Sequence, residues 1–371
     1  MGGVLADSRI GAMNEADVQS VLAECIDPNT GRDLVRDRAV KRLQIEGDEV
    51  AVDIVLGYPA RSQYDAIRKM VAERLRSLPG APRVHVSVSH KIISHAVQRG
   101  VKLKPGIRNI IAVASGKGGV GKSTTAVNLA LALAAEGASV GILDADIYGP
   151  SQPQMLGITG RPESIDGKTL EPMEAHGLQA MSIGFLIDVD TPMVWRGPMV
   201  TQALEQLLSD TNWRDLDYLV VDMPPGTGDI QLTLSQKVPV TGAVIVTTPQ
   251  EIALLDARKG LKMFEKVGIP IVGIVENMSM HQCSQCGHLE PIFGEGGGQA
   301  MCRDYNVPFL GGLPLDRRIR EQADGGRPTV VADPEGAVAR IYRDIARKVA
   351  VFIAQKSEDH SAKFPTIKVV N

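Results

Sequence analysis

The stretch SGKGGVGKST, residues 115–124, determines the fold class of this chain. Gly116 through Ser123 match the pattern G-x-x-x-x-G-K-[ST], with the apolar run RNIIAVAS before the loop and the helix-forming run STTAVNLALALAAEG after it. Between a strand and a helix, this spacing predicts a loop whose backbone N–H groups surround a phosphate at the positive end of the helix. A glycine-rich turn used only for packing would not need the Lys-Ser pair, so we favour the phosphate loop.

The residues of this loop have distinct expected roles. Lys122 is expected to neutralise the β- and γ-phosphates of a nucleotide, and the hydroxyl of Ser123 is expected to ligate Mg²⁺. The loop residues expected to bind the nucleotide are Gly116, Lys117, Gly118, Gly119, Val120, Gly121, Lys122, Ser123 and Thr124.

The chain beyond this loop alternates strands with helices. The apolar strands ASVGILDAD, YLVVDMP, GAVIVTTP and IVGIVENM are separated by helical stretches. Near-continuous Val/Ile runs in this order indicate a parallel sheet that is buried on both faces. We therefore predict an α/β fold, a P-loop NTPase with a mostly parallel sheet covered by helices on both faces, over residues 108–356. A polar tail is expected over residues 357–371.

The region before the phosphate loop has a different pattern. A helical run, EADVQSVLAECI, precedes two strands around a turn at residues 46–48, and apolar residues alternate from Val50 to Leu56. A second helical run and a third alternating strand follow. This pattern predicts a small α+β domain over residues 1–95. The basic segment at residues 96–107 is expected to be a linker.

Composition argues against several classes of function. The net charge of −3 and the aromatic content of 4% give no reason to expect nucleic-acid binding. No apolar run approaches the roughly 18 residues that a membrane span needs, so no stable membrane association is expected. Four cysteines in 371 residues do not make a disulfide framework. We expect a cytoplasmic soluble protein.

Two of the four cysteines form a C-x-x-C pair in the stretch MHQCSQCGHLE. Cys283 and Cys286 have the spacing at which two thiolates bind one metal centre, but a closed sulfur-ligated site generally uses four protein ligands. The other two cysteines form no second pair. We expect Cys302 to pack as a small buried side chain, whereas for Cys25 a packing role and a transient ligand role both remain open. One chain therefore supplies half of the ligands.

Polar residues follow three of the predicted strands. Asp144 and Asp146 end ILDAD, and Asp222 ends YLVVD, at the edge of an open α/β sheet where ligands bind. Asn277 follows the strand of VENMS, where a simple turn role is the alternative. A lone acidic residue at a strand end is often only a cap, but three such signals in this order favour a site.

A second lysine inside the loop distinguishes this chain from ordinary phosphate-loop proteins. Lys117, in GKGGVGK, resembles the signature lysine of the deviant Walker A class, which includes MinD, ParA, the nitrogenase iron protein and the arsenical pump ATPase. The resemblance implies a homodimer with the nucleotides between its subunits, in which Lys117 reaches the phosphates of the facing subunit. An ordinary surface lysine is the alternative.

The same resemblance implies roles for the residues at the strand ends. Asp146 would orient or activate the attacking water, Asp144 would hold hydrated Mg²⁺, and Asp222 would be the Walker B-like carboxylate for the metal. In the switch-like loop PPGTGD, the amide of Gly226 would donate to the γ-phosphate. Asn277 would hydrogen-bond the adenine edge, so the expected nucleotide is ATP.

The order GKGGVGKST, DADIYGPS, DMPPGTGD, VENMS and one C-x-x-C resembles the Mrp/ApbC iron–sulfur carrier ATPases over most of residues 108–330. The N-terminal region, with DPNTGRDLV and GYPARSQ, resembles the SufT-related assembly domain. These resemblances imply that Cys283 and Cys286 from two subunits hold one bridging [4Fe–4S] cluster. The cluster would come from a scaffold or donor protein and pass to apo iron–sulfur proteins, with ATP binding and hydrolysis modulating the transfer.

Two alternatives remain open at this point. His281 and His288 flank the cysteine pair, so zinc held by one chain is an alternative to the cluster. A positioning ATPase of the MinD or ParA kind, with a structural metal site, is an alternative function that needs a membrane-targeting amphipathic tail. The run AVARIYRDIARKVAVFIAQK has that pattern, but we expect it to be the final helix packed on the sheet.

Overall fold

The computed structural model describes residues 14–79, 83–98, 101–187, 197–283 and 285–356. The chain forms two compact units, Met1–Ile92 and Ile93–Asn371. The predicted tail, residues 357–371, lies outside the described residues.

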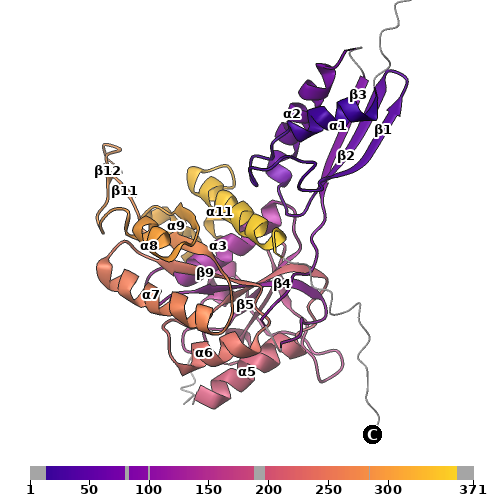
Figure 1. The fold of residues 1–371 in the computed structure, drawn as a ribbon. Helices are drawn as coiled ribbons and strands as arrows, with labels where there is room; N and C mark the ends of the chain where they lie inside the picture. Colours follow the sequence, from indigo (N-terminus) through magenta and orange to yellow (C-terminus); the bar gives the residue numbers. More distant parts are fainter. Residues whose placement is uncertain (1–13, 80–82, 99–100, 188–196, 284, 357–371) are drawn as a thin grey trace, which may run out of the picture. The chain divides into compact units, whose positions relative to one another are not determined.

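Within residues 14–79 and 83–92, the first unit has three strands and two helices (Figure 1). Its elements are α1 (Glu15–Ala23), β1 (Val40–Glu46), β2 (Glu49–Leu56), the 3₁₀ turn η1 (Arg61–Gln63), α2 (Tyr64–Arg76) and β3 (Arg83–His90). The sheet order is β1–β2–β3, with β1 antiparallel and β3 parallel to β2. A parallel neighbour requires a crossover, and α2 provides it, so this unit has the predicted succession of helices and strands.

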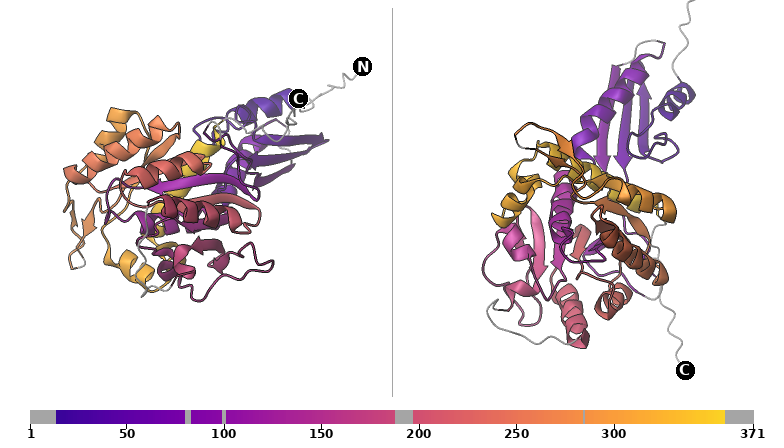
Figure 2. Two further views of the ribbon diagram at one scale, coloured as in Figure 1. Left: turned by 90° about the horizontal axis from the view of Figure 1, so that it is seen from below. Right: turned by 90° about the vertical axis from the view of Figure 1, so that its left-hand side faces the viewer.

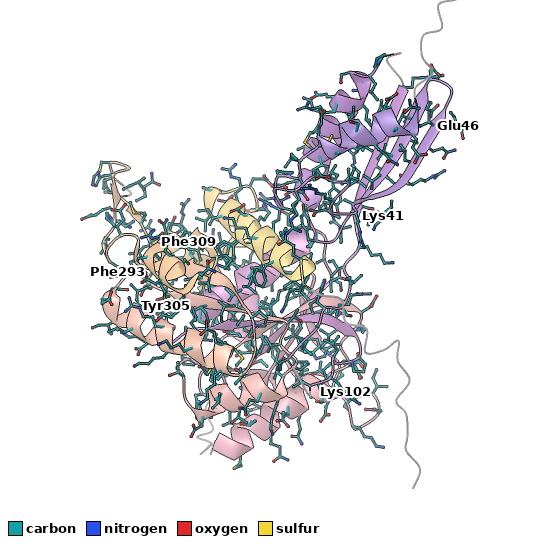
Figure 3. All side chains as sticks on the ribbon, in the orientation of Figure 1. Lys41, Glu46, Lys102, Phe293, Tyr305 and Phe309 are labelled. Atoms are coloured by element: carbon teal, nitrogen blue, oxygen red, sulfur yellow. The ribbon has the colours of Figure 1, made fainter. Side chains whose placement is uncertain are left out.

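Alternation along β2 determines which face of this small sheet is packed. Every second residue from Val50 to Leu56 is buried, and Ile67 of α2 is buried with them. The residues between them are half-buried, and side chains of the edge strand such as Lys41 and Glu46 are exposed (Figure 3). The sheet therefore packs its apolar face against helices and keeps a polar face, as period-2 patterning predicts.

The second unit contains an eight-stranded sheet in the order β13–β10–β9–β4–β8–β5–β7–β6. All neighbouring strands are parallel except β6, which runs antiparallel to β7. The strands are β4 (Ile107–Ala114), β5 (Val140–Asp144), β6 (Met173–Ala175), β7 (Leu178–Ser182), β8 (Leu216–Asp222), β9 (Gly242–Thr247), β10 (Ile271–Glu276) and β13 (Phe309–Gly312). The predicted mostly parallel sheet is confirmed.

Helices cover both faces of this sheet (Figures 1 and 2). The helices α3 (Lys122–Ala135) and α11 (Ala337–Ala354) pack together on one face, and α5 (Gly197–Asp210), α6 (Asp229–Lys237) and α7 (Glu251–Lys266) follow one another on the other. The remaining elements are α4 (Gln152–Leu156), η2 (Ile183–Phe185), α8 (Gly297–Tyr305), α9 (Arg317–Asp324), α10 (Thr329–Ala332) and the short strands β11 (His281–Gln282) and β12 (Leu289–Glu290).

The central strands are buried over nearly all of their length, which explains why their sequences are almost continuous apolar runs. Every residue of β5, β9 and β10 is buried. Part of the expected linker also belongs to this unit, because the buried Gln98 donates from Nε2 to the carbonyl oxygens of Ser235 and Val238 (3.0 and 2.5 Å). The boundary between the two units, at Ile92 and Ile93, precedes that linker.

Candidate functional site

The phosphate loop connects β4 to α3, and its shape depends on glycine. Gly119 and Gly121 have φ angles of +82° and +83°, in the left-handed region that favours glycine. A Cβ atom at Gly116 would lie 2.1 Å from the backbone carbonyl carbon of Asp256, so the loop passes directly against α7. The predicted loop therefore lies between a strand and a helix N-terminus, as the motif requires.

Lys122, the first residue of α3, points at carboxylates from two other strand ends. Its Nζ is 2.5 Å from Oδ1 of Asp222, 3.0 Å from Oγ of Ser123 and 3.7 Å from Oδ2 of Asp146. This proximity follows from the sheet order, because β4 lies beside β8 and β8 lies beside β5. The structure thus brings together four of the predicted site residues.

Asp144 is fully buried at the end of β5, where four donors surround its carboxylate. The backbone N–H groups of Asp146, Ser151 and Gln152 donate to it at 3.0 to 3.1 Å, and the hydroxyl of Ser182 donates at 3.2 Å. These bonds fix the carboxylate in one orientation.

The charge balance of this site favours binding of a cation. Burial, followed by repulsion from Asp222, raises the pKa of Asp144 to about 7. Burial also raises the pKa of Asp146, while Lys122 opposes that rise. Three carboxylates share one lysine, so a divalent cation would relieve their repulsion.

Two residues predicted to contact the nucleotide are hydrogen-bonded to the phosphate loop. The N–H of Gly226 donates to the carbonyl oxygen of Ser115 (3.0 Å), and Nδ2 of Asn277 donates to the carbonyl oxygen of Val120 (2.9 Å). A Cβ atom at Gly121 would lie 2.1 Å from that Nδ2 atom. Both residues lie against the loop, and their roles toward phosphate and adenine stay predictions.

Lys117 differs sharply from Lys122. Its side chain is exposed, and its ammonium group has no hydrogen bond or ion pair with any residue that the structure describes. Its carbonyl oxygen accepts a hydrogen bond from the hydroxyl of Ser115 (2.9 Å), which holds the backbone of the loop. The two lysines of one loop therefore have opposite environments, one buried among carboxylates and one directed to the surface.

Sequence reasoning missed two polar residues of this site. Gln152 and Ser182 are both buried and both bond carboxylates of the strand ends. Gln152 is the first residue of α4 and lies six positions after Asp146, and this closeness to the DAD strand end was the available signal. Nothing in the sequence around Ser182, at the end of β7, distinguishes it from a structural serine.

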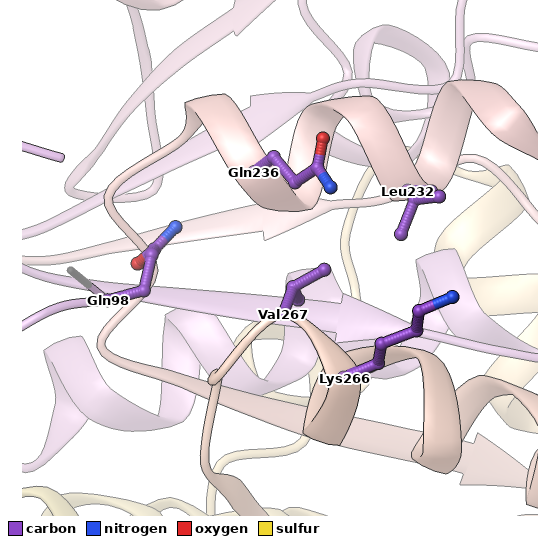
Figure 4. A pocket seen from close by; sticks show the side chains of 5 residues that line it. All are labelled: Gln98, Leu232, Gln236, Lys266 and Val267. Atoms are coloured by element: carbon purple, nitrogen blue, oxygen red, sulfur yellow. The ribbon is translucent and has the colours of Figure 1, made fainter. Parts of the chain in front are cut away.

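Two cavities of similar size lie in the second unit. One, of about 400 Å³, is adjacent to the carboxylate site and is lined by Asp146, Tyr148, Pro224, Pro225, Gly228, Asp229, Ile230 and Gln231. The other, of about 370 Å³, is lined by Gln98, Leu232, Gln236, Lys266 and Val267 (Figure 4). Its lining contains no carboxylate, thiol or imidazole, so we do not assign chemistry to it.

The C-x-x-C pair occupies the tip of a small hairpin formed by β11 and β12. The N–H of Cys283 donates to the carbonyl oxygen of His288 (2.8 Å), and the N–H of Gly287 donates to the carbonyl oxygen of Cys283 (2.9 Å). Backbone N–H groups of Cys286 and then Gln285 donate to the Cys283 sulfur and lower the pKa of its thiol. Cys286 is exposed and Cys283 half-exposed, so both thiols can reach a metal centre.

The described part of one chain does not complete a metal site around these thiols. Among the described residues, no three His, Cys, Asp or Glu side chains are grouped so that they could hold a metal. Nδ1 of His281 instead lies 3.1 Å from the carbonyl oxygen of Leu315. Mg²⁺ does not need such a group, because one or two carboxylates and substrate phosphates generally hold it.

The other two cysteines are buried in this structure. Cys302 is buried in α8, and burial followed by the charge of Glu276 raises the pKa of its thiol to about 11. Cys25 is buried after α1, where burial raises the pKa of its thiol. Near α8, Phe293, Tyr305 and Phe309 are half-buried (Figure 3).

Most of the apolar stripe of α11 is covered by protein, although Ile341 and Phe352 are half-buried. Val338, Ile345 and Val349 are buried, and the helix packs against α3 and β13. This agrees with the expected final helix packed on the sheet. Within the described ranges, no helix is long and apolar enough to cross a membrane.

A phosphate loop opening α3, buried carboxylates on neighbouring strand ends and a mostly parallel sheet define a P-loop NTPase. Family models match both units: "NUBPL iron-transfer P-loop NTPase" over residues 106–350 and "Iron-sulfur cluster assembly protein" over residues 15–88. The chain belongs to the family of iron–sulfur cluster carrier proteins. The sequence-based assignment to this family is confirmed.

Named relatives cover between two thirds and nearly all of the chain. The iron-sulfur cluster carrier protein of Salmonella typhimurium is 52% identical over 92% of this chain and 93% of its own length. The iron-sulfur cluster transfer protein NUBPL of Mus musculus is 52% identical over 67% of this chain and 79% of its own length.

Solved structures agree with the fold. A nucleotide-binding protein from Archaeoglobus fulgidus in complex with ADP is 39% identical, with a TM-score of 0.55 over 62% of this chain and 90% of that one. The cell division ATPase MinD of Pyrococcus furiosus, at 22% identity and a TM-score of 0.50 over 65% of this chain and 98% of its own, supports the fold alone.

Proposed function

We propose that two copies of this protein bind one [4Fe–4S] cluster between them and deliver it to apo iron–sulfur proteins under the control of ATP. The observation that carries the proposal is the two-thiolate hairpin. Cys283 and Cys286 are accessible, and no further ligand joins them among the described residues. A two-fold axis near the hairpins would supply the four thiolates that such a cluster needs.

In the nucleotide site, each residue has a proposed task that its position supports. Lys122 would leave the Asp222 carboxylate for the β- and γ-phosphates, since both are anionic partners for its buried ammonium group. Ser123 and Asp222 would hold Mg²⁺, with Asp144 beside them. When bound, Mg²⁺ neutralises charge on the phosphates. Asp146, half-buried beside Lys122, would orient the attacking water.

Two further contacts would change on binding of ATP. The N–H of Gly226 would exchange the carbonyl oxygen of Ser115 for a γ-phosphate oxygen, which is a stronger acceptor. Asn277, already against the loop, would bond the adenine edge. Lys117, exposed and without an ionic partner among the described residues, would bind the phosphates of the facing subunit.

The proposed cargo route has a donor and a recipient. A scaffold or donor protein would load the cluster, and apo iron–sulfur proteins would accept it. The curated relatives are named as carrier and transfer proteins, which supports this direction. Because α11 packs on α3 and β13 and buries most of its apolar stripe, we do not propose a membrane-positioning function.

Cluster transfer to an apo-enzyme tests the proposal. The anaerobically reconstituted protein would be mixed with an apo-dehydratase that is active only with a [4Fe–4S] cluster, with and without MgATP. We expect recovery of dehydratase activity at a rate that depends on nucleotide, and no recovery with the double variant of Cys283 and Cys286 to Ala. Equal recovery from that variant, or from free iron and sulfide at matched concentrations, would contradict it.

A further inference from the structure

Gln152 joins three of the residues proposed to hold magnesium. Its Nε2 atom donates to Oδ2 of Asp222 (2.9 Å) and to the carbonyl oxygen of Ser123 (3.2 Å). Its backbone N–H donates to Oδ2 of Asp144 (3.0 Å). The residue is 1% exposed, so water does not compete for these bonds. One side chain and its own backbone thus connect the ends of β5 and β8 with the start of α3.

The chemistry of its partners fixes the orientation of the Gln152 amide. Both partners of Nε2, a carboxylate and a backbone carbonyl, only accept hydrogen bonds, so the NH₂ group must face them. The Oε1 atom of the same planar amide is buried and accepts no hydrogen bond from any described residue. A buried acceptor left in that condition is costly, at about 1 to 3 kcal/mol. The described residues therefore leave this acceptor open to a further donor.

The two oxygens of Asp222 have different donors. Oδ1 accepts from Lys122, and Oδ2 accepts from Gln152. If Lys122 moves to the phosphates, the Gln152 amide is the remaining side-chain donor to Asp222 among the described residues. It would keep the carboxylate in its rotamer while the cation enters.

We propose that Gln152 is a positioning residue for magnesium, which orients Asp222 through Nε2 and accepts a hydrogen bond from the hydration shell of the cation through Oε1. This inference rests on the proposed nucleotide function. Outer residues that orient metal ligands generally affect metal affinity about 10- to 100-fold. A purely structural amide would affect folding and would leave the magnesium requirement unchanged.

The test uses two matched substitutions in one helix. Gln152→Met keeps the length of the side chain and removes both polar atoms. Gln154→Met makes the same change two residues later, on an exposed side chain whose Nε2 donates to the carbonyl oxygen of Asp324 (2.7 Å). Binding of a fluorescent ATP analogue is measured in EDTA and during a Mg²⁺ titration, and Mn²⁺ binding to the ADP complex is followed by electron paramagnetic resonance.

For Gln152→Met we expect the Mg²⁺ concentration at half-saturation to rise about tenfold or more, with affinity in EDTA within about twofold of the natural protein. Gln154→Met should change neither value. Thermal unfolding checks that each variant folds, and Gln152→Asn, which keeps the amide but shortens its reach, replaces the Met variant if that does not fold.

An unchanged Mg²⁺ midpoint in a folded Gln152 variant would overturn the inference alone. If the natural protein showed no magnesium-dependent nucleotide binding, the proposed function itself would fail. Loss of affinity in EDTA to the same extent as in Mg²⁺ would assign Gln152 a structural role and would also overturn the inference.

Discussion

The nucleotide site and the cysteine hairpin are built on opposite principles. The nucleotide site is closed within one chain: Lys122, Asp144 and Asp222 are buried and have hydrogen-bonded partners. The hairpin is exposed, and its two thiols have no further ligand among the described residues. Only the short segment from Asn277 to Cys283 separates the two regions in the sequence. One chain thus has buried residues that could bind a nucleotide, with Lys117 of a second copy proposed to assist hydrolysis, whereas the two thiols would need a second copy to complete a cluster site.

Removal of a thiol should break the hairpin site completely. With Cys283→Ala or Cys286→Ala, two copies supply two thiolates in place of four, so the brown chromophore of anaerobic reconstitution should be lost. Absorbance and iron analysis measure this, and ATP binding should be unchanged because the nucleotide site does not use these residues. Cys302→Ala is the matched control, since this buried thiol is not grouped with other ligands. A normal chromophore in either hairpin variant would refute the ligand assignment.

Substitution of Lys122 should have the next largest effect, confined to the other site. Lys122→Ala removes the main counter-charge for the phosphates, and we expect ATP affinity to fall by about 100-fold or more. It also leaves Asp222 buried without its ion-pair partner, which generally costs about 3 to 5 kcal/mol of stability. Calorimetric titration and thermal unfolding measure the two effects. Full retention of ATP affinity would contradict the phosphate role.

Substitution of Lys117 should sharpen the contrast between the two lysines. Because Lys117 is exposed, Lys117→Ala should leave ATP affinity within about twofold while hydrolysis falls about tenfold or more, if it acts across the dimer. Steady-state turnover and nucleotide binding are compared, with Lys102→Ala as an exposed-lysine control. If Lys117→Ala lost nucleotide binding and hydrolysis to the same extent as Lys122→Ala, the proposed action of Lys117 on the facing subunit would be contradicted.

A change in the hairpin turn should have the smallest effect. Gly287 has a φ of +73°, and a Cβ there would contact only the side chain of Gln282, at 3.8 Å. Gly287→Ala therefore adds only backbone strain of about 1 to 2 kcal/mol to the hairpin. We expect cluster retention to weaken about tenfold without complete loss, measured as the rate of bleaching by a chelator. Gly47→Ala, at φ +60° in the turn between β1 and β2, controls for strain elsewhere and should leave bleaching unchanged.

Sequence patterns predicted the parts of this molecule that depend on local spacing. The loop at residues 116–124 and the strand-end carboxylates were predictable because strand, turn and helix follow one another in the chain. Their convergence on Lys122 was predictable in outline, since parallel strands end at one edge of a sheet.

Contacts between distant segments could not be predicted. The bond of Gln152 to Asp222 links positions 70 residues apart, and a glutamine after Gly-Pro-Ser resembles any surface residue. The bond between Gly226 and Ser115 depends on the conformation of the loop after β8, which spacing does not determine. The burial of Gln98 likewise depends on a contact with the C-terminal end of α6. The sequence alone therefore predicted a linker for the segment that contains Gln98.

The requirement for two copies is the central claim, and one measurement tests it directly. Protein reconstituted with iron and sulfide under strict anaerobiosis is passed over a size-exclusion column with light scattering, and iron is determined in the fraction whose mass is known. We predict four iron atoms per pair of chains at the mass of a dimer, and loss of iron when the dimer is diluted to single chains. A full four-iron cluster on a fraction with the mass of one chain would contradict the account.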